Sequence, residues 1–363
     1  MADYSEYGNF LAGEWIELAK STAQSKWGSK ESNDLQEMRQ IENRRRETLA
    51  RDILTTPDSV HIDDISIPAL DASTIAARLY RPKATAGASK LPLYIHLHGG
   101  GWHYGTLDTE EPYCMTLCAD VAQAYERHQI AVLNVNYRHA PDYKFPTQAD
   151  DAWAALSLAH DRDFCMKYGI DADQIIIGGT SAGAALAIST GLREMRRMQN
   201  EKKAPHHQRS RIQGLVLSSS PTVHPDLFPF SYLQSKTISS HEQFQTTGIL
   251  PTVVAKFFCS MYLPDDNDET KSNEWVSPLL VPKESWNAIL WPATSIHVAG
   301  ADTFRDEGLL FHAKLQEIGI KTRLCIHAGY PHAFERFPQL EESVRWRAQV
   351  ADDIQWLLTQ REM

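Results

Sequence analysis

The chain has 363 residues, of which 42% are hydrophobic and 23% are charged. This composition can fill a sizeable core, so it excludes disordered and fibrous proteins. The 36 Lys and Arg are outnumbered by 46 Asp and Glu, which gives a formal net charge of −10. That balance argues against a nucleic-acid partner, because binding to phosphates depends on basic side chains.

The sequence also indicates where the protein works. No apolar run approaches the roughly 18 residues of a membrane span. The acidic, Trp-containing N-terminus lacks the pattern of a signal peptide. Five cysteines are an odd count in a long chain and favour free thiols in a reducing compartment. We therefore expect a cytoplasmic protein with no membrane insertion.

The first half of the chain changes its hydrophobic period twice. Residues 1–50 are polar and helical in pattern, whereas Val60–Pro68 and Ile75–Pro82 alternate with a period of two. The latter two segments are typical of a hairpin-like pair of strands. Such a pair predicts an antiparallel edge for any sheet that follows.

Short apolar runs then alternate with helix-length segments. The expected strands are Leu93–Leu97, Ile130–Asn136, Gln174–Ile177, Gly214–Leu217, Thr294–Val298 and Thr322–Ile326. The expected helices are Gln148–His160, Ala182–Met198, Asp306–Ile318 and Gln339–Leu358. This alternation predicts an α/β fold, a mostly parallel sheet flanked by helices. The aromatic-rich stretch from Ser220 to Trp291 has no clear strand, and a connection of that length is typical of a lid.

The strongest chemical signal is the pentapeptide Gly-Thr-Ser-Ala-Gly at 179–183, with Ser181 at its centre. Such a match alone is weak, but this one lies between an expected strand and an Ala-rich helix. That context is typical of the sharp turn that exposes a nucleophilic serine in α/β-hydrolases. The N-terminal N–H groups of the following helix would face the developing negative charge.

A glycine loop precedes this motif in the sequence. His98, three glycines and Trp102 directly follow an expected strand. Consecutive glycines cost backbone entropy, and an oxyanion hole is a function that needs them. We expect Gly100 and Gly101 to donate N–H groups from this loop and Ala182 to donate from the turn. A flexible loop unrelated to catalysis is the alternative.

A nucleophilic serine needs a base and an orienting acid. Asp302 and His332 follow the last two expected strands, so both should reach the sheet edge where Ser181 lies. The chain order serine, acid, histidine is also that of α/β-hydrolases. The competing acids are Asp306 and Glu307, which should lie inside a helix, and the competing bases are His327 and His103.

Metal and nucleotide cofactors are not expected. Cys114 and Cys118 are four residues apart, but no second Cys or His pair has the spacing of a zinc site. No G-x-G-x-x-G pattern opens a helix.

These motifs resemble the hormone-sensitive-lipase-like branch of the α/β-hydrolase superfamily, from about Leu93 to Phe334. The matching segments are 98–102, 137–142, 145–146, 151–156, 179–183, 277–280, 302–307 and 332–334. The resemblance implies an α/β-hydrolase fold with a catalytic domain at 51–363 and a helical cap built from 1–50 and about 222–285. It also implies the same triad and oxyanion donors, without a cofactor.

The chain departs from the family pattern at several positions. Thr180 stands where many members have Asp, Thr303-Phe304 replace Pro-Leu, and Ala184 replaces a common Gly. We expect none of these to touch a catalytic side chain, but they weaken any transfer of substrate preference.

We therefore expect a serine carboxylesterase that hydrolyses short- to medium-chain acyl esters through an acyl-enzyme. A metabolite-tailoring acyltransferase or lyase on the same site, and a non-catalytic small-molecule receptor, are the alternatives. The partner is a small-molecule ester. The sequence does not name the natural substrate or the oligomeric state, for which a homodimer stays open.

Overall fold

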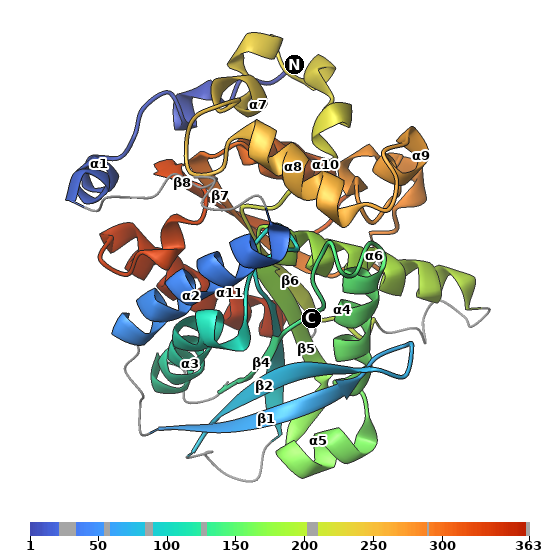
Figure 1. Ribbon diagram of the computed structural model, residues 1–363. Coiled ribbons are helices and arrows are strands. Elements are labelled where there is room, and N and C mark those ends of the chain that lie inside the picture. The colour runs from blue at the N-terminus through green and yellow to red at the C-terminus, as the bar shows by residue number, and fades with distance from the viewer. Residues whose placement is uncertain are drawn as a thin grey trace.

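An eight-stranded sheet forms the centre of the computed structural model (Figure 1). The structure describes residues 1–21, 34–53, 59–83, 90–124, 129–201, 210–288 and 290–360. The strands are β1 (Val60–Pro68), β2 (Thr74–Pro82), β3 (Leu91–Leu97), β4 (Ala131–Val135), β5 (Ile170–Thr180), β6 (Gly214–Ser218), β7 (Ala293–Ala301) and β8 (Thr322–Pro331).

The strand order across the sheet is β1-β2-β4-β3-β5-β6-β7-β8. β1 pairs with β2 and β2 with β4 in antiparallel register, and every later pairing is parallel. The predicted mostly parallel sheet and its antiparallel edge are confirmed. Because β5, β7 and β8 are parallel, the residues that follow them meet at one edge.

Helices cover both faces of the sheet. One face carries α3 (Leu107–Ala124) and α11 (Glu341–Thr359), and the other carries α4 (Thr147–Leu158), α5 (Arg162–Tyr168), α6 (Ala182–Asn200) and α10 (Arg305–Glu317). Successive strand residues alternate between the two layers. In β5, for example, Ile176 packs with α3 and α11, whereas Ile175 and Ile177 pack in the opposite core. The expected strands and helices all appear, with ends shifted by a few residues; α5 was not predicted, and no bounds were predicted for α3.

The helices outside these layers gather near the carboxyl edge of the sheet. They are α1 (Gly13–Ser21), α2 (Leu35–Ile53), α7 (Ser240–Gln243), α8 (Thr252–Tyr262) and α9 (Asp268–Lys271). Figure 1 shows α7, α8 and α9 grouped at one end of the molecule, with the N-terminus beside them. Ala2 pairs with Leu233, so the two segments expected to form the cap are in contact. Part of the first segment, 22–33, lies outside the described residues.

Candidate active site

Ser181 lies at the tight turn between β5 and α6. Its backbone has φ 56° and ψ −122°, an uncommon conformation for a residue with a side chain and one that costs about 1–3 kcal/mol. The Ser181 N–H donates to the Ser218 carbonyl at 2.8 Å, and the Ser181 carbonyl accepts from the Ala185 N–H at 3.1 Å. A Cβ at Gly183 would lie 1.9 Å from the Leu97 carbonyl oxygen, so only glycine allows this close approach.

A hydrogen-bonded line runs from this serine through the two side chains that follow β8 and β7. Ser181 Oγ lies 3.0 Å from His332 Nε2, and His332 Nδ1 lies 2.8 Å from Asp302 Oδ2. The three residues are 6%, 6% and 2% exposed. Asp302 Oδ1 also accepts from the Phe304 N–H at 3.1 Å, which fixes the carboxylate. This geometry fits a nucleophile, a base and an orienting acid.

The competing acids and bases lie in other networks. Asp306 accepts from Arg305 at 2.7 Å, and Glu307 pairs with His241 at 2.8 Å. His327 binds Glu342 at 2.6 Å, and His103 lies 2.6 Å from the Ala140 carbonyl. Both acids lie inside α10, as expected. The structure therefore brings only Asp302 and His332, among the weighed candidates, to Ser181.

The glycine loop after β3 borders the same centre. Gly100 and Gly101 have φ 137° and 61°, and a Cβ on Gly101 would lie 2.4 Å from the Phe258 ring of α8. His98 donates from Nδ1 to the Gly99 carbonyl at 3.1 Å. Burial lowers the pKa of His98 to about 4, so this ring is neutral. The loop is thus fixed by the hydrogen bond from the buried His98 ring, and Phe258 of α8 packs on its other side.

The oxyanion donors expected from the sequence lie around one cavity. Gly100, Gly101 and Ala182 line it together with Ser181 and His332. Ala182 is the first residue of α6, where backbone N–H groups have no intrahelical acceptor. Their placement fits N–H groups that converge on a substrate oxygen.

This catalytic cavity has a volume of about 800 Å³, its open mouth included. Its lining is mainly apolar and comes largely from the segment 221–276 and the loop after β7. The apolar members are Trp102, Ala182, Ala185, Pro221, Val223, Pro225, Leu250, Ala255, Phe258, Cys259, Tyr262, Trp275, Val276, Phe304 and Ala333. A cavity of this size and character fits an acyl or alcohol group of a small ester.

Several contacts of the site, and the presence of Arg336 in it, were not predicted from the sequence. Trp102 stacks on Tyr262 with ring centroids 4.2 Å apart. Phe304 meets the His332 ring edge-on at 5.5 Å, and Arg336 lines the cavity from the segment after His332. The only signal for Arg336 is its position four residues after His332. The aromatic pairs join segments far apart in the sequence, so no local pattern marks them.

Two of the departures from the family pattern, Thr303 and Phe304, lie in the loop after β7. Thr303, next to Asp302, hydrogen-bonds through Oγ1 to Thr252 Oγ1 of α8 at 2.5 Å. Phe304 packs edge-on against the ring of His332, so the expectation that no departure touches a catalytic side chain is wrong for this residue. Of the two residues that replace Pro-Leu, Thr303 therefore connects the loop of the expected acid to α8, and Phe304 packs on the expected base.

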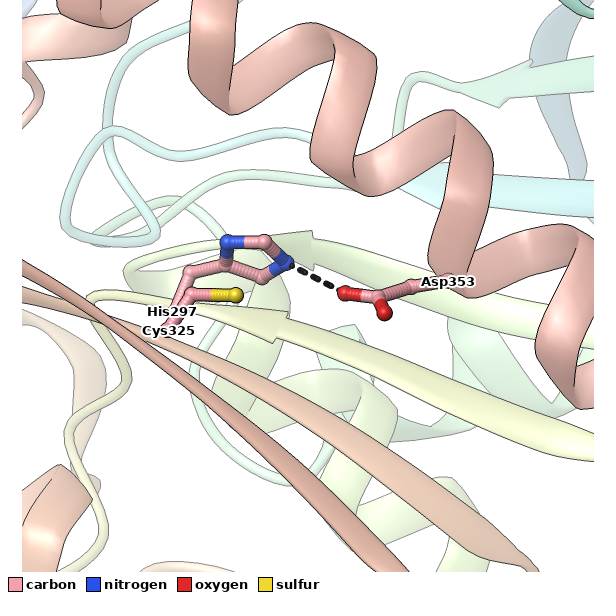
Figure 2. Close-up of side chains that lie close together, drawn as sticks. All are labelled: His297, Cys325 and Asp353. Carbon is pink, nitrogen blue, oxygen red and sulfur yellow. Dashed lines mark hydrogen bonds and ion pairs between the residues drawn. The ribbon is translucent and has the colours of Figure 1, made fainter.

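One cluster outside the cavity contains residue types that bind metals. Atoms of His297, Cys325 and Asp353 lie within 4.8 Å of one another, and Figure 2 shows His297 directed at Asp353. However, His297 Nε2 lies 3.0 Å from Asp353 Oδ2, which also accepts from Ser295. Arg323 binds the other carboxylate oxygen at 3.0 Å. The carboxylate is already satisfied by these donors, so the cluster fits an ion-pair network that joins α11 to β7 and β8.

We expect Asp353→Asn to reduce the free energy of unfolding by about 2 kcal/mol at pH 7, because it removes the charge from a buried hydrogen-bonded carboxylate. Burial alone would raise the pKa of Asp353, but His297, Ser295 and Arg323 hold that pKa below its ordinary value. The carboxylate therefore stabilises the fold above the unfolded pKa of about 4, and this contribution declines as pH falls further. Urea unfolding at pH 7 and at about pH 3.5 measures the loss.

The matched control is Asp352→Asn on the exposed neighbour, which should change stability little. The assigned network is contradicted if Asp353→Asn loses no more free energy of unfolding than Asp352→Asn does. It is also contradicted if the loss in Asp353→Asn is as large at about pH 3.5 as at pH 7.

In the described part of the chain, no helix is long and apolar enough to cross a membrane. All five cysteines are unpaired.

The chain matches the alpha/beta hydrolase fold family over residues 94–336, more than half of its length. It is 31% identical over 283 residues to the carboxylic ester hydrolase LipN of Mycobacterium tuberculosis, covering 77% of this chain and 66% of that protein. It is 29% identical to an ethyl acetate hydrolase of Pseudomonas putida, covering 77% and 78%. The solved structure of a Pyrobaculum calidifontis esterase superposes with a TM-score of 0.75 at 25% identity, covering 95% and 98%.

Proposed function

The chain belongs to the alpha/beta hydrolase fold family and is a carboxylic ester hydrolase, and from this premise we propose that it cleaves short- to medium-chain acyl esters with Ser181 as nucleophile. His332 is the general base and Asp302 orients it. Gly100, Gly101 and Ala182 supply the oxyanion N–H groups.

In the proposed acylation step, His332 Nε2 takes the proton of Ser181 Oγ as this oxygen attacks the ester carbonyl. The carbonyl oxygen becomes an oxyanion, which the three backbone N–H groups stabilise. The imidazolium, stabilised by Asp302, then protonates the departing alcohol and leaves an acyl-serine. Water activated by His332 hydrolyses this ester and releases the acid.

The observation that carries this proposal is the hydrogen-bonded line from Ser181 through His332 to Asp302, at the wall of a mainly apolar cavity. The apolar lining supports an aliphatic acyl group, and the limited volume supports a short or medium one.

The cap, built from 1–50 and about 222–285, is part of the proposal. The contact of Phe258 with the glycine loop and the pairing of Ala2 with Leu233 support it. Three further points also remain predictions: the cytoplasmic location, a small-molecule ester as partner, and a homodimer as one option for the oligomeric state.

A panel of p-nitrophenyl esters from acetate to laurate tests the substrate range. We expect kcat/KM to be highest for short or medium chains and to fall toward laurate, because the cavity cannot enclose a long chain. Free acid should accumulate in step with p-nitrophenol.

A maximum at laurate contradicts the proposed chain length. An acyl product transferred to an added alcohol, in place of free acid, would instead indicate an acyltransferase.

A further inference from the structure

Arg336 brings a fixed positive charge to the wall of the catalytic cavity. It ends the short helix η8 (Phe334–Arg336), which follows His332 by one residue. Among the described lining residues it is the only lysine, arginine, aspartate or glutamate. Its side chain is 26% exposed. A charge at the wall of a mainly apolar pocket costs free energy unless polar groups pair with it.

The guanidinium lies close to the nucleophile. Arg336 Nη2 and Ser181 Cβ lie 3.5 and 3.4 Å from the point where a Cβ on Gly99 would stand. The two atoms are therefore at most about 7 Å apart. A substrate group bound to Arg336 would lie within a few bonds of the ester carbonyl that Ser181 attacks.

Protein partners use little of the hydrogen-bonding capacity of Arg336. Within the described residues its contacts are the Gly99 carbonyl at 3.5 Å and Glu110 Oε1 at 3.6 Å, both long. Glu110 also binds His96 at 3.0 Å, so its charge is shared. A guanidinium has five N–H donors, whose planar arrangement suits a carboxylate.

A second cavity of about 1010 Å³, its open mouth included, lies behind Arg336 and shares this residue and Thr180 with the catalytic cavity. It is lined by Arg46, whose pKa is lowered to about 10 by burial and by the charge of Arg336. Burial raises the pKa of Glu335, another lining residue, which favours its neutral form. Arg46 therefore adds a second positive charge behind Arg336, beside the ionised carboxylate of Glu110, whose pKa is held at about 2 by His96 and Arg336.

We propose that Arg336 binds a carboxylate on the substrate, so that the enzyme accepts half-esters of short dicarboxylic acids such as succinate. The proposal rests on the proposed esterase function and names the substrate class of the same site. The free carboxylate of the acyl group pairs with Arg336 while its esterified end lies at Ser181 and the oxyanion N–H groups. The apolar walls hold the methylene carbons between them.

The test compares monoethyl succinate with ethyl butyrate, which differ by a carboxylate in place of a methyl group. The readout is the ratio of their kcat/KM values, measured by release of ethanol. We expect Arg336→Gln to lower this ratio at least about tenfold, mainly through KM, because a charged hydrogen bond is lost. Arg336→Lys should restore part of it, since it keeps the charge but not the planar fork.

Arg347→Gln is the matched control, because Arg347 lines the second cavity and pairs with Asp120 without reaching the catalytic one. It should leave the ratio unchanged. A less than tenfold fall in Arg336→Gln, or an equal fall in Arg347→Gln, overturns the proposal.

If Arg336→Gln does not fold, assays of the wild type with added NaCl test whether a positive charge binds the substrate carboxylate. KM for monoethyl succinate should rise relative to that for ethyl butyrate, because salt screens the ion pair, and an unchanged ratio overturns the assignment. If the wild type hydrolyses neither the p-nitrophenyl esters nor these two, the esterase function itself fails.

Discussion

Replacing Ser181 by alanine is expected to lower kcat by about 10⁶-fold, the loss seen when the nucleophile of a serine hydrolase triad is removed. The Oγ atom that lies 3.0 Å from His332 Nε2 is the atom that would form the acyl ester. Alanine leaves His332 without a proton to accept, while the backbone of the turn stays compatible. Hydrolysis of p-nitrophenyl butyrate and labelling by a fluorophosphonate measure the effect.

Ser220→Ala provides the control, because Ser220 is also buried near the end of β6 but does not line the catalytic cavity. It should keep both activity and labelling. A Ser181→Ala enzyme that retains a tenth of wild-type turnover, with the fold verified by circular dichroism, would rule out this serine as the nucleophile.

The hydrophobic period was sufficient to predict the sheet. The period of two in Val60–Pro68 reappears as β1, and the apolar run before Ser181 reappears as β5. Placing Asp302 and His332 after strands then predicted that they meet Ser181, because the carboxyl ends of parallel strands share an edge. These predictions rest on signals that are local in the sequence.

Contacts between distant segments could not be predicted in this way. Gly101 is covered by Phe258, which lies more than 150 residues later in the chain. His297 in β7 binds Asp353, which lies on helix α11. The spacing typical of a zinc site joins residues close in the sequence, whereas the cluster in Figure 2 draws its members from β7, β8 and α11. Such pairs depend on register and helix packing, which no single-segment pattern encodes.

Arg336 shows the same limit at the site itself. Its residue type and its separation from His332 in the sequence can be read directly, but the direction in which its side chain points cannot. Only the short helix η8 places the guanidinium between two cavities and near Gly99. A charged side chain on a loop is otherwise most often a solvated one.

Replacing Asp302 by asparagine is expected to lower kcat by about 10⁴-fold. A carboxylate only accepts hydrogen bonds, so Asp302 Oδ2 at 2.8 Å requires the proton of His332 on Nδ1. Nε2 is then free to accept the Ser181 proton at 3.0 Å. An asparagine side chain can donate to Nδ1, which moves the imidazole proton to Nε2 and removes the base. The pre-steady-state rate of p-nitrophenol release from the acetate ester reports this step directly.

Asp306→Asn separates the role of Asp302 from a general loss of charge in this region. Asp306 is as buried as Asp302 but is bound by Arg305 and the Ser240 N–H, not by His332. Its substitution should therefore lower stability more than it lowers kcat, and the two effects are resolved by measuring urea unfolding beside turnover. If Asp306→Asn lost about 10⁴-fold in kcat while Asp302→Asn remained active, the orienting acid would lie inside α10. The hydrogen-bonded line through His332 would then not be the catalytic one.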